Sequence, residues 1–188
     1  MVGDRGRGRG VVVAGDSIAG EIARTPVLAG CRCVAEDGSS FGQVAQQLRA
    51  LPATDAAKAT TLVVVCSGAN DGMDVVDEVS KHCANVLVTC SQRCPGADLV
   101  FIRPGWSTVG GSELASLDAA RWLESEGETV RDVDGVAPSY GLVSTGRRRA
   151  AKRQRVGKRL HYTVGNGGAP DGSAFLNAQI KGIMASLQ

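Results

Sequence analysis

The stretch Val11-Val12-Val13-Ala14-Gly15-Asp16-Ser17 decides the fold class of this chain. Its β-branched apolar residues are typical of a buried strand, and the small polar residues after them are typical of a turn into a helix. Because ligands of open α/β sheets bind at the carboxyl ends of the strands, Ser17 is expected where a nucleophile can act. The same turn is also explained as a plain helix start with Asp16 or Ser17 as the N-cap.

A second predicted strand ends in a similar turn. Thr61-Leu62-Val63-Val64-Val65-Cys66 is again apolar and β-branched, and it is followed by Ser67-Gly68-Ala69-Asn70-Asp71-Gly72. The amide of Asn70 can donate a hydrogen bond to an oxyanion, although these residue types also suit an ordinary turn. Two such turns on parallel strands lie at the same edge of a sheet. We therefore expect an exposed Ser17 within about 4 Å of the Asn70 side chain.

The rest of the chain alternates strand-like and helix-like segments. Strands are expected at 10–14, 31–35, 61–66 and 98–102, and helices at 18–24, 42–51, 73–92, 111–126 and 176–187. A fifth strand is expected at either 128–133 or 160–164. This alternation predicts an α/β fold, a three-layer sandwich with a central parallel sheet of about five strands.

The two polar turns together resemble the blocks of a known family. Gly15-Asp16-Ser17 and Gly68-Ala69-Asn70-Asp71 match the Gly-Asp-Ser and Gly-x-Asn-Asp blocks of the SGNH, or GDSL-type, hydrolases. The resemblance implies the flavodoxin-like SGNH hydrolase fold and an esterase activity on small acyl or acetyl esters. It implies that Ser17 is the nucleophile, with the oxyanion held by Asn70 and by the backbone N–H groups of Ser17 and Gly38. Gly42 is the alternative to Gly38.

The family's fourth block, Asp-x-x-His, has only a partial counterpart. Asp171-Gly172-Ser173-Ala174 has the aspartate and precedes a predicted helix, but Ala174 stands where the resemblance implies the general-base histidine. Three explanations remain: an engineered replacement of that histidine, its natural loss in a binding fold, or a base supplied by His161 and oriented by Asp171. Against His161, Lys158 occupies the acid position three residues before it. His82 is expected inside a helix.

Basic residues are concentrated in one segment. The chain has 21 Lys and Arg against 19 Asp and Glu, yet residues 147–159 are mostly basic, so the remaining body is acidic. We divide the chain into a basic, flexible N-terminal arm over 1–10 and a hydrolase domain over 11–188, with a basic insert at about 144–159. A basic run without aromatic residues suits phosphate contacts, although a solvated loop explains it equally well. Nucleic-acid contacts are expected at Arg147, Arg148, Arg149, Lys152 and Arg153.

This insert supports a competing function. A catalytically inactive hydrolase fold could serve as a nucleic-acid or protein-binding module. The combination also resembles the esterase domains in first-open-reading-frame proteins of some retrotransposons, where a basic segment would bind nucleic acid.

Length and composition agree with a globular domain. The chain has 188 residues, 43% of them hydrophobic, which is enough for one sizeable core. Its apolar runs are shorter than the roughly 20 residues of a membrane span or the roughly 7–15 of a signal-peptide core, so we expect an intracellular protein, cytoplasmic or nuclear. We expect no metal and no cofactor, because the cysteines lack paired C-x-x-C spacing and fit buried free thiols. They are Cys31, Cys33, Cys66, Cys83, Cys90 and Cys94.

Overall fold

The computed structural model describes residues 8–66, 70–71, 76–104, 112–133, 143–144, 160–161 and 172–187. A five-stranded parallel sheet has the order β2-β1-β3-β4-β5. Its strands are β1 (Val11–Ala14), β2 (Arg32–Cys33), β3 (Thr61–Val65), β4 (Asp98–Arg103) and β5 (Val130–Asp132). The helices are α1 (Ser17–Ala23), the 3-10 turn η1 (Pro26–Leu28), α2 (Phe41–Ala50), α3 (Ala53–Ala56), α4 (Val76–Arg93), α5 (Ser112–Ser125) and α6 (Gly172–Ala185).

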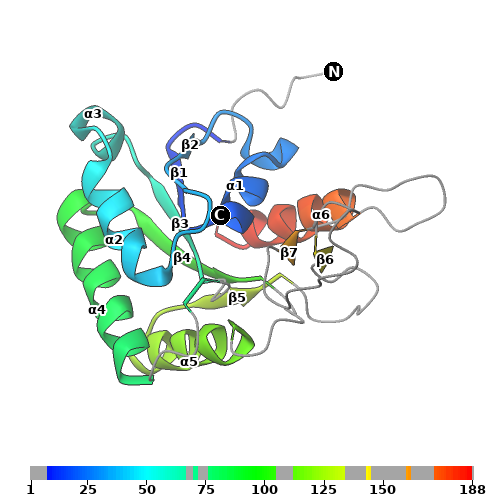
Figure 1. Cartoon of the computed structure of the whole chain (residues 1–188). Helices are drawn as coiled ribbons and strands as arrows, with labels where there is room; N and C mark the ends of the chain where they lie inside the picture. The colour runs from blue at the N-terminus through cyan, green and yellow to red at the C-terminus, as the bar shows by residue number, and fades with distance from the viewer. Residues whose placement is uncertain are drawn as a thin grey trace, which may run out of the picture.

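The central strands β1 and β3 are almost entirely apolar because both faces of the sheet are covered. Val11 and Val13 of β1 belong to one core, together with buried residues of α1 and α6. Val12 and Ala14 point the other way, into a core shared with α2, α4 and α5. Figure 1 shows the same layers, with α1 and α6 on one side of the sheet and α2, α4 and α5 on the other. The predicted three-layer α/β sandwich is confirmed.

The strand order places the reversal of the sheet between β1 and β3. From β1 the chain passes to β2 on one side, and from β3 it continues to β4 and β5 on the other. In doubly wound sheets of this order, ligands bind in the crevice at that switch point, outside the carboxyl ends of the strands. The two polar turns noted in the sequence follow these two strands.

The structure selects one of the two places expected for the fifth strand, and the last helix differs from its predicted range. The fifth strand of the sheet is β5, within the expected 128–133, whereas Leu160–His161 forms β7 and pairs antiparallel with β6 (Val143–Ser144). Helix α6 begins at Gly172, four residues earlier than expected, so position 174 lies in its first turn. Glycine and serine are weak helix formers, yet residues 172–173 are helical, because tertiary packing supplies most of the stability of a helix in a folded protein.

Residues 8–10, which we expected in the flexible N-terminal arm, pack against the rest of the chain. Gly8–Gly10 forms a turn in which the Val11 N–H donates to the Gly8 carbonyl over 3.2 Å. The Gly10 carbonyl accepts a hydrogen bond from the Thr60 N–H over 2.8 Å, and Gly8 is buried against the backbone of Leu28 and Ala29. These residues therefore belong to the folded body, and the rest of the predicted arm, residues 1–7, lies outside the described residues. No helix in the described part of the chain is both long enough and apolar enough to cross a membrane.

Candidate active site at the carboxyl ends of β1 and β3

The first turn of the site connects β1 directly to α1. Asp16 is the N-cap of α1, and its Oδ1 accepts a hydrogen bond from the Ile18 N–H over 2.9 Å. Ser17 is the first residue of the helix and is 9% exposed. The expectation of an exposed Ser17 is wrong, because α1 starts without a linker and packs at once against the sheet.

Gly15 gives this turn its shape. Its φ is +143°, a region that L side chains rarely adopt. A Cβ atom at this position would lie 2.8 Å from the Cβ of Ala19 and 3.1 Å from the Cβ of Val65. Only glycine lets α1 approach the sheet this closely, so Gly15 fixes where Ser17 lies.

The second turn brings Asn70 to the same place. The Asn70 side chain is exposed, and its Nδ2 donates to the Ser39 carbonyl over 2.9 Å and to Asp16 Oδ2 over 3.3 Å. Asp71, the next residue, accepts a hydrogen bond from the Phe41 N–H at Oδ1 over 2.7 Å. The turn after β3 is thus joined both to the residue before Ser17 and to the loop that leads into α2.

That loop contains the expected oxyanion glycine. The Ser39 N–H donates to the Glu36 carbonyl over 3.2 Å, which closes a turn with Gly38 at its third position. Gly38 has a φ of +82°, a value that glycine adopts without strain, and it is exposed. The alternative, Gly42, lies inside α2, where a Cβ would meet the His82 ring at 2.7 Å. Helix packing explains Gly42, so Gly38 stays the candidate.

Gln47 is a part of the site that sequence analysis missed. It lies in α2, is 4% exposed, and hydrogen-bonds both the N–H and the carbonyl of Gly15. A glutamine beside the apolar face formed by Phe41, Val44, Ala45 and Leu48 was the available signal. Buried polar side chains need partners, so such a residue indicates a specific tertiary contact.

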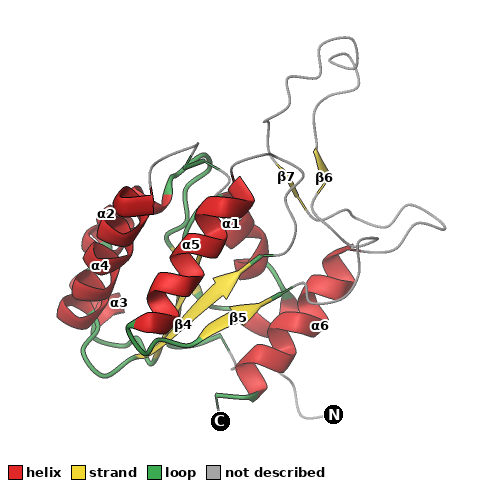
Figure 2. Ribbon diagram, turned by 90° about the horizontal axis from the view of Figure 1, so that it is seen from below, coloured by secondary structure: helices red, strands yellow, loops and turns green. Residues whose placement is uncertain are grey.

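Both positions considered for the base lie on elements that contact α1. Residues of β7, which contains His161, come within 8 Å of residues of α1, measured between Cα atoms, and α6 does so as well. In Figure 2 the arrowheads of β4 and β5 point toward the side where β6 and β7 lie. Only the backbone is described at His161 and Ala174. Asp171 and the basic residues Arg147, Arg148, Arg149, Lys152 and Arg153 lie outside the described residues.

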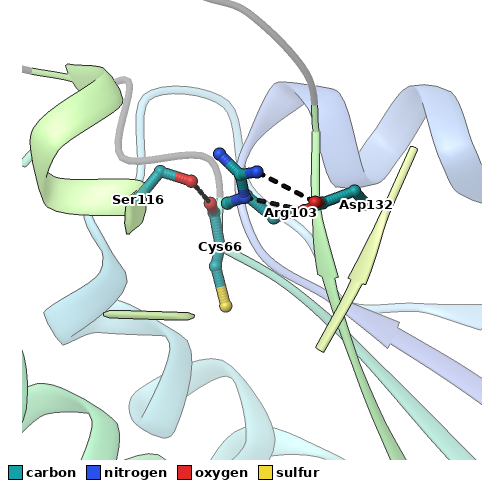
Figure 3. A network of polar contacts seen from close by, with 4 residues as sticks. All are labelled: Cys66, Arg103, Ser116 and Asp132. Atoms are coloured by element: carbon teal, nitrogen blue, oxygen red, sulfur yellow. Dashed lines mark hydrogen bonds and ion pairs between the residues drawn. The ribbon is translucent and has the colours of Figure 1, made fainter. Parts of the chain in front are cut away.

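The carboxyl ends of β3, β4 and β5 are fixed by side chains. Ser116 of α5 donates its hydroxyl to the Cys66 carbonyl over 2.6 Å, and Arg103 forms a two-pronged ion pair with Asp132 at 2.7 and 2.9 Å (Figure 3). These contacts join the end of β3 to α5 and the end of β4 to the end of β5. Burial raises the pKa of the Cys66 thiol well above its usual value, so this thiol stays protonated near neutral pH.

The remaining cysteines differ in their burial. Cys83, Cys90 and Cys94 are buried like Cys66, as expected, whereas Cys33 is exposed and Cys31 is partly buried. Across the described residues, no group of three or more His, Cys, Asp or Glu side chains is arranged to hold a metal ion.

Solved structures share this architecture over nearly the whole chain. A GDSL-like lipase from Bacteroides thetaiotaomicron superposes with a TM-score of 0.59 at 14% identity, covering 95% of this chain and 88% of the lipase. The chain has the fold of the GDSL-like hydrolases. A Bacteroides fragilis protein assigned as an acylhydrolase superposes on this chain with a TM-score of 0.57 at 13% identity, covering 94% of this chain and 86% of the acylhydrolase.

The similarity to these two proteins lies in the structure and is not detected in the sequence. No protein-family model matches the sequence, and no curated protein matches it either. At 13–14% identity the likeness establishes the GDSL fold, and the chemistry has to be argued from the residues at the switch point.

Proposed function

We propose that this chain is a serine ester hydrolase acting on small acyl esters. The observation that carries the proposal is the pair of hydrogen bonds from Asn70 to Asp16 and to Ser39. They join the turn of the proposed nucleophile, the loop of the proposed oxyanion glycine and the turn after β3 at the switch point of the sheet. The GDSL fold supports the same reading.

In the proposed reaction, the Ser17 hydroxyl attacks the ester carbonyl carbon and gives its proton to a base. The negative charge on the carbonyl oxygen is then stabilised by the Asn70 amide and by the backbone N–H groups of Ser17 and Gly38. When the C–O bond to the alcohol breaks, the leaving oxygen takes the proton from the base, and an acyl-Ser17 ester remains. Water, deprotonated by the same base, hydrolyses this ester and restores the Ser17 hydroxyl.

Position 174 is where the resemblance implies the base, and because that position is alanine, His161 is the alternative base that we propose for this chain. The approach of β7 to α1, whose first residue is Ser17, supports it. Asp171 would orient the imidazole. Ala174 has no proton acceptor in its side chain, so a base at that position would require histidine there.

Hydrolysis of p-nitrophenyl acetate tests this proposal. The chain should exceed the Ser17→Ala variant in rate, and His161→Ala should fall to the level of Ser17→Ala, a loss of about three or more orders of magnitude. His82→Ala is the matched control, since His82 and His161 are the two histidines of the sequence, and its rate should equal that of the unaltered chain.

Other outcomes distinguish the alternatives. An inactive chain that gains several orders of magnitude from Ala174→His, and loses them again with Ser17→Ala, would retain Ser17 but place the base at position 174. If all variants including Ala174→His are inactive, the esterase proposal is wrong and the inactive binding module is favoured.

A further inference from the structure

The side-chain amide of Gln47 pairs with the main-chain N–H and carbonyl of Gly15, as the backbone of a neighbouring strand would. Its Oε1 accepts a hydrogen bond from the Gly15 N–H over 3.0 Å, and its Nε2 donates to the Gly15 carbonyl over 2.9 Å. Gly15 is the first residue after β1, so the amide continues the hydrogen bonding of the strand beyond its end. The Gly15 carbonyl also accepts from the Glu36 N–H over 3.1 Å.

The second hydrogen of Nε2 reaches the neighbouring loop. It is donated to Ser39 Oγ over 2.9 Å, while the carbonyl of the same Ser39 accepts from Asn70. Asn70 Nδ2 also donates a hydrogen bond to Asp16 Oδ2, and Asp16 is covalently joined to Gly15. The contacts therefore form a closed ring through Gly15, Gln47, Ser39, Asn70 and Asp16.

From this ring we infer that Gln47 is a positioning residue that fixes the Ser17 turn relative to the Gly38 loop and Asn70. The inference rests on the proposed function for its effect on turnover. Gln47 holds the backbone two residues before Ser17 and the side chain one residue after Gly38, so it sets the distance between nucleophile and oxyanion donors. Small displacements of such groups can lower rates by about 100-fold.

The chemistry of this contact requires glutamine. A main-chain N–H and carbonyl pair needs one acceptor and one donor side by side, which the carboxamide supplies. Ionised glutamate has the same shape but no donor, so it would place negative charge against the Gly15 carbonyl and Ser39 Oγ. Protonation of that glutamate would restore one donor.

The test compares Gln47→Glu with Gln46→Glu in p-nitrophenyl acetate hydrolysis. Gln46 is exposed and is its neighbour in α2, so it receives the same substitution away from the ring. Gln47→Glu should lower kcat by about 10- to 100-fold with KM changed less than about twofold, and kcat should rise as pH is lowered relative to that of Gln46→Glu. Circular dichroism at the assay temperature must show both variants folded. An unchanged kcat, or an equal loss in Gln46→Glu, would overturn the inference.

Amide hydrogen exchange separates this inference from the proposed function. In the unaltered chain the Gly15 N–H should exchange slowly, and Gln47→Leu, which removes its acceptor, should speed that exchange by at least about 10-fold relative to Gln46→Leu. If the chain hydrolyses no faster than Ser17→Ala, the proposed function fails, and the exchange of Gly15 still decides whether Gln47 fixes the turn. Equal Gly15 exchange rates in the two leucine variants would show that it does not.

Discussion

The side-chain amide of Asn70 donates a hydrogen bond to the carbonyl oxygen of Ser39 over 2.9 Å. The same nitrogen lies 3.3 Å from Asp16 Oδ2, so its two N–H groups have two acceptors in reach. The contact with Asp16 is the longer one. When an oxyanion forms, we expect the N–H near Asp16 to turn to it, while Ser39 holds the amide in place.

Replacing Asn70 should therefore impair turnover more than binding. Asn70→Ala should lower kcat about 10²- to 10³-fold with little change in KM, because the donor acts on charge that develops in the transition state. Steady-state kinetics on p-nitrophenyl acetate measures this. Asn85→Ala is the matched control, since Asn85 lies in α4 and hydrogen-bonds Arg49. A raised KM with unchanged kcat would contradict the oxyanion role.

Gly15 should tolerate no side chain. In Gly15→Ala, the new methyl group would meet the Ala19 and Val65 Cβ atoms at 2.8 and 3.1 Å, and the φ of +143° would be strained. We expect the free energy of unfolding to fall by about 1–3 kcal/mol.

Gly20→Ala in the same helix is the control for this strain. A Cβ at Gly20 would meet only the tip of Arg24, at 3.7 Å, and alanine in a helix interior is favoured by about 0.5–1 kcal/mol over glycine. Urea unfolding should therefore move in opposite directions for the two variants. Equal stabilities would show that α1 can shift to accept a side chain at position 15.

The sheet could be predicted from the sequence because its information is local. The β-branched runs of β1 and β3 indicate buried parallel strands, and Asp16 before an apolar helix indicates an N-cap, which the structure confirms. The pairing of the two polar turns followed from the rule that parallel strands bring their carboxyl ends to one edge.

The rest of the site depends on tertiary contacts that no local pattern specifies. Gln47 and Gly15 are 32 residues apart, and their contact depends on how α2 lies over the sheet. The burial of Ser17 likewise follows from the packing of α1. The pairing of β7 with β6 involves only two residues in each strand, too few for a pattern of period two to be recognised.

The buried thiols predict a dependence of stability on pH. Burial raises the pKa of Cys83 and Cys90 from 9.0 to about 12. A raised folded-state pKa means that the unfolded chain loses its thiol protons first, so the free energy of unfolding should fall as pH rises from about 9 toward 12. Urea unfolding across this range should show the decrease, with a shallower slope for Cys83→Ala. Val86→Ala, another buried truncation in α4, should lower stability without changing the slope.

The last prediction concerns the basic segment, for which we propose phosphate contacts. If Arg147, Arg148 and Arg149 bind nucleic acid, their joint replacement by alanine should weaken binding to every sequence alike and reduce the magnitude of the log–log salt slope for duplex DNA by about 2–3. Fluorescence anisotropy with labelled duplexes of unrelated sequence, between low and moderate salt, measures both quantities.

Joint replacement of Arg49, Arg121 and Lys181 by alanine is the matched control. These exposed residues lie on α2, α5 and α6, so the variant loses the same charge away from the segment. The control should keep most of the affinity, because counterion release depends on cations that contact phosphates and hardly on net charge alone. Equal losses of affinity in the two variants would indicate a general charge effect. If the unaltered chain does not bind DNA at low salt, the basic segment is better explained as a solvated loop.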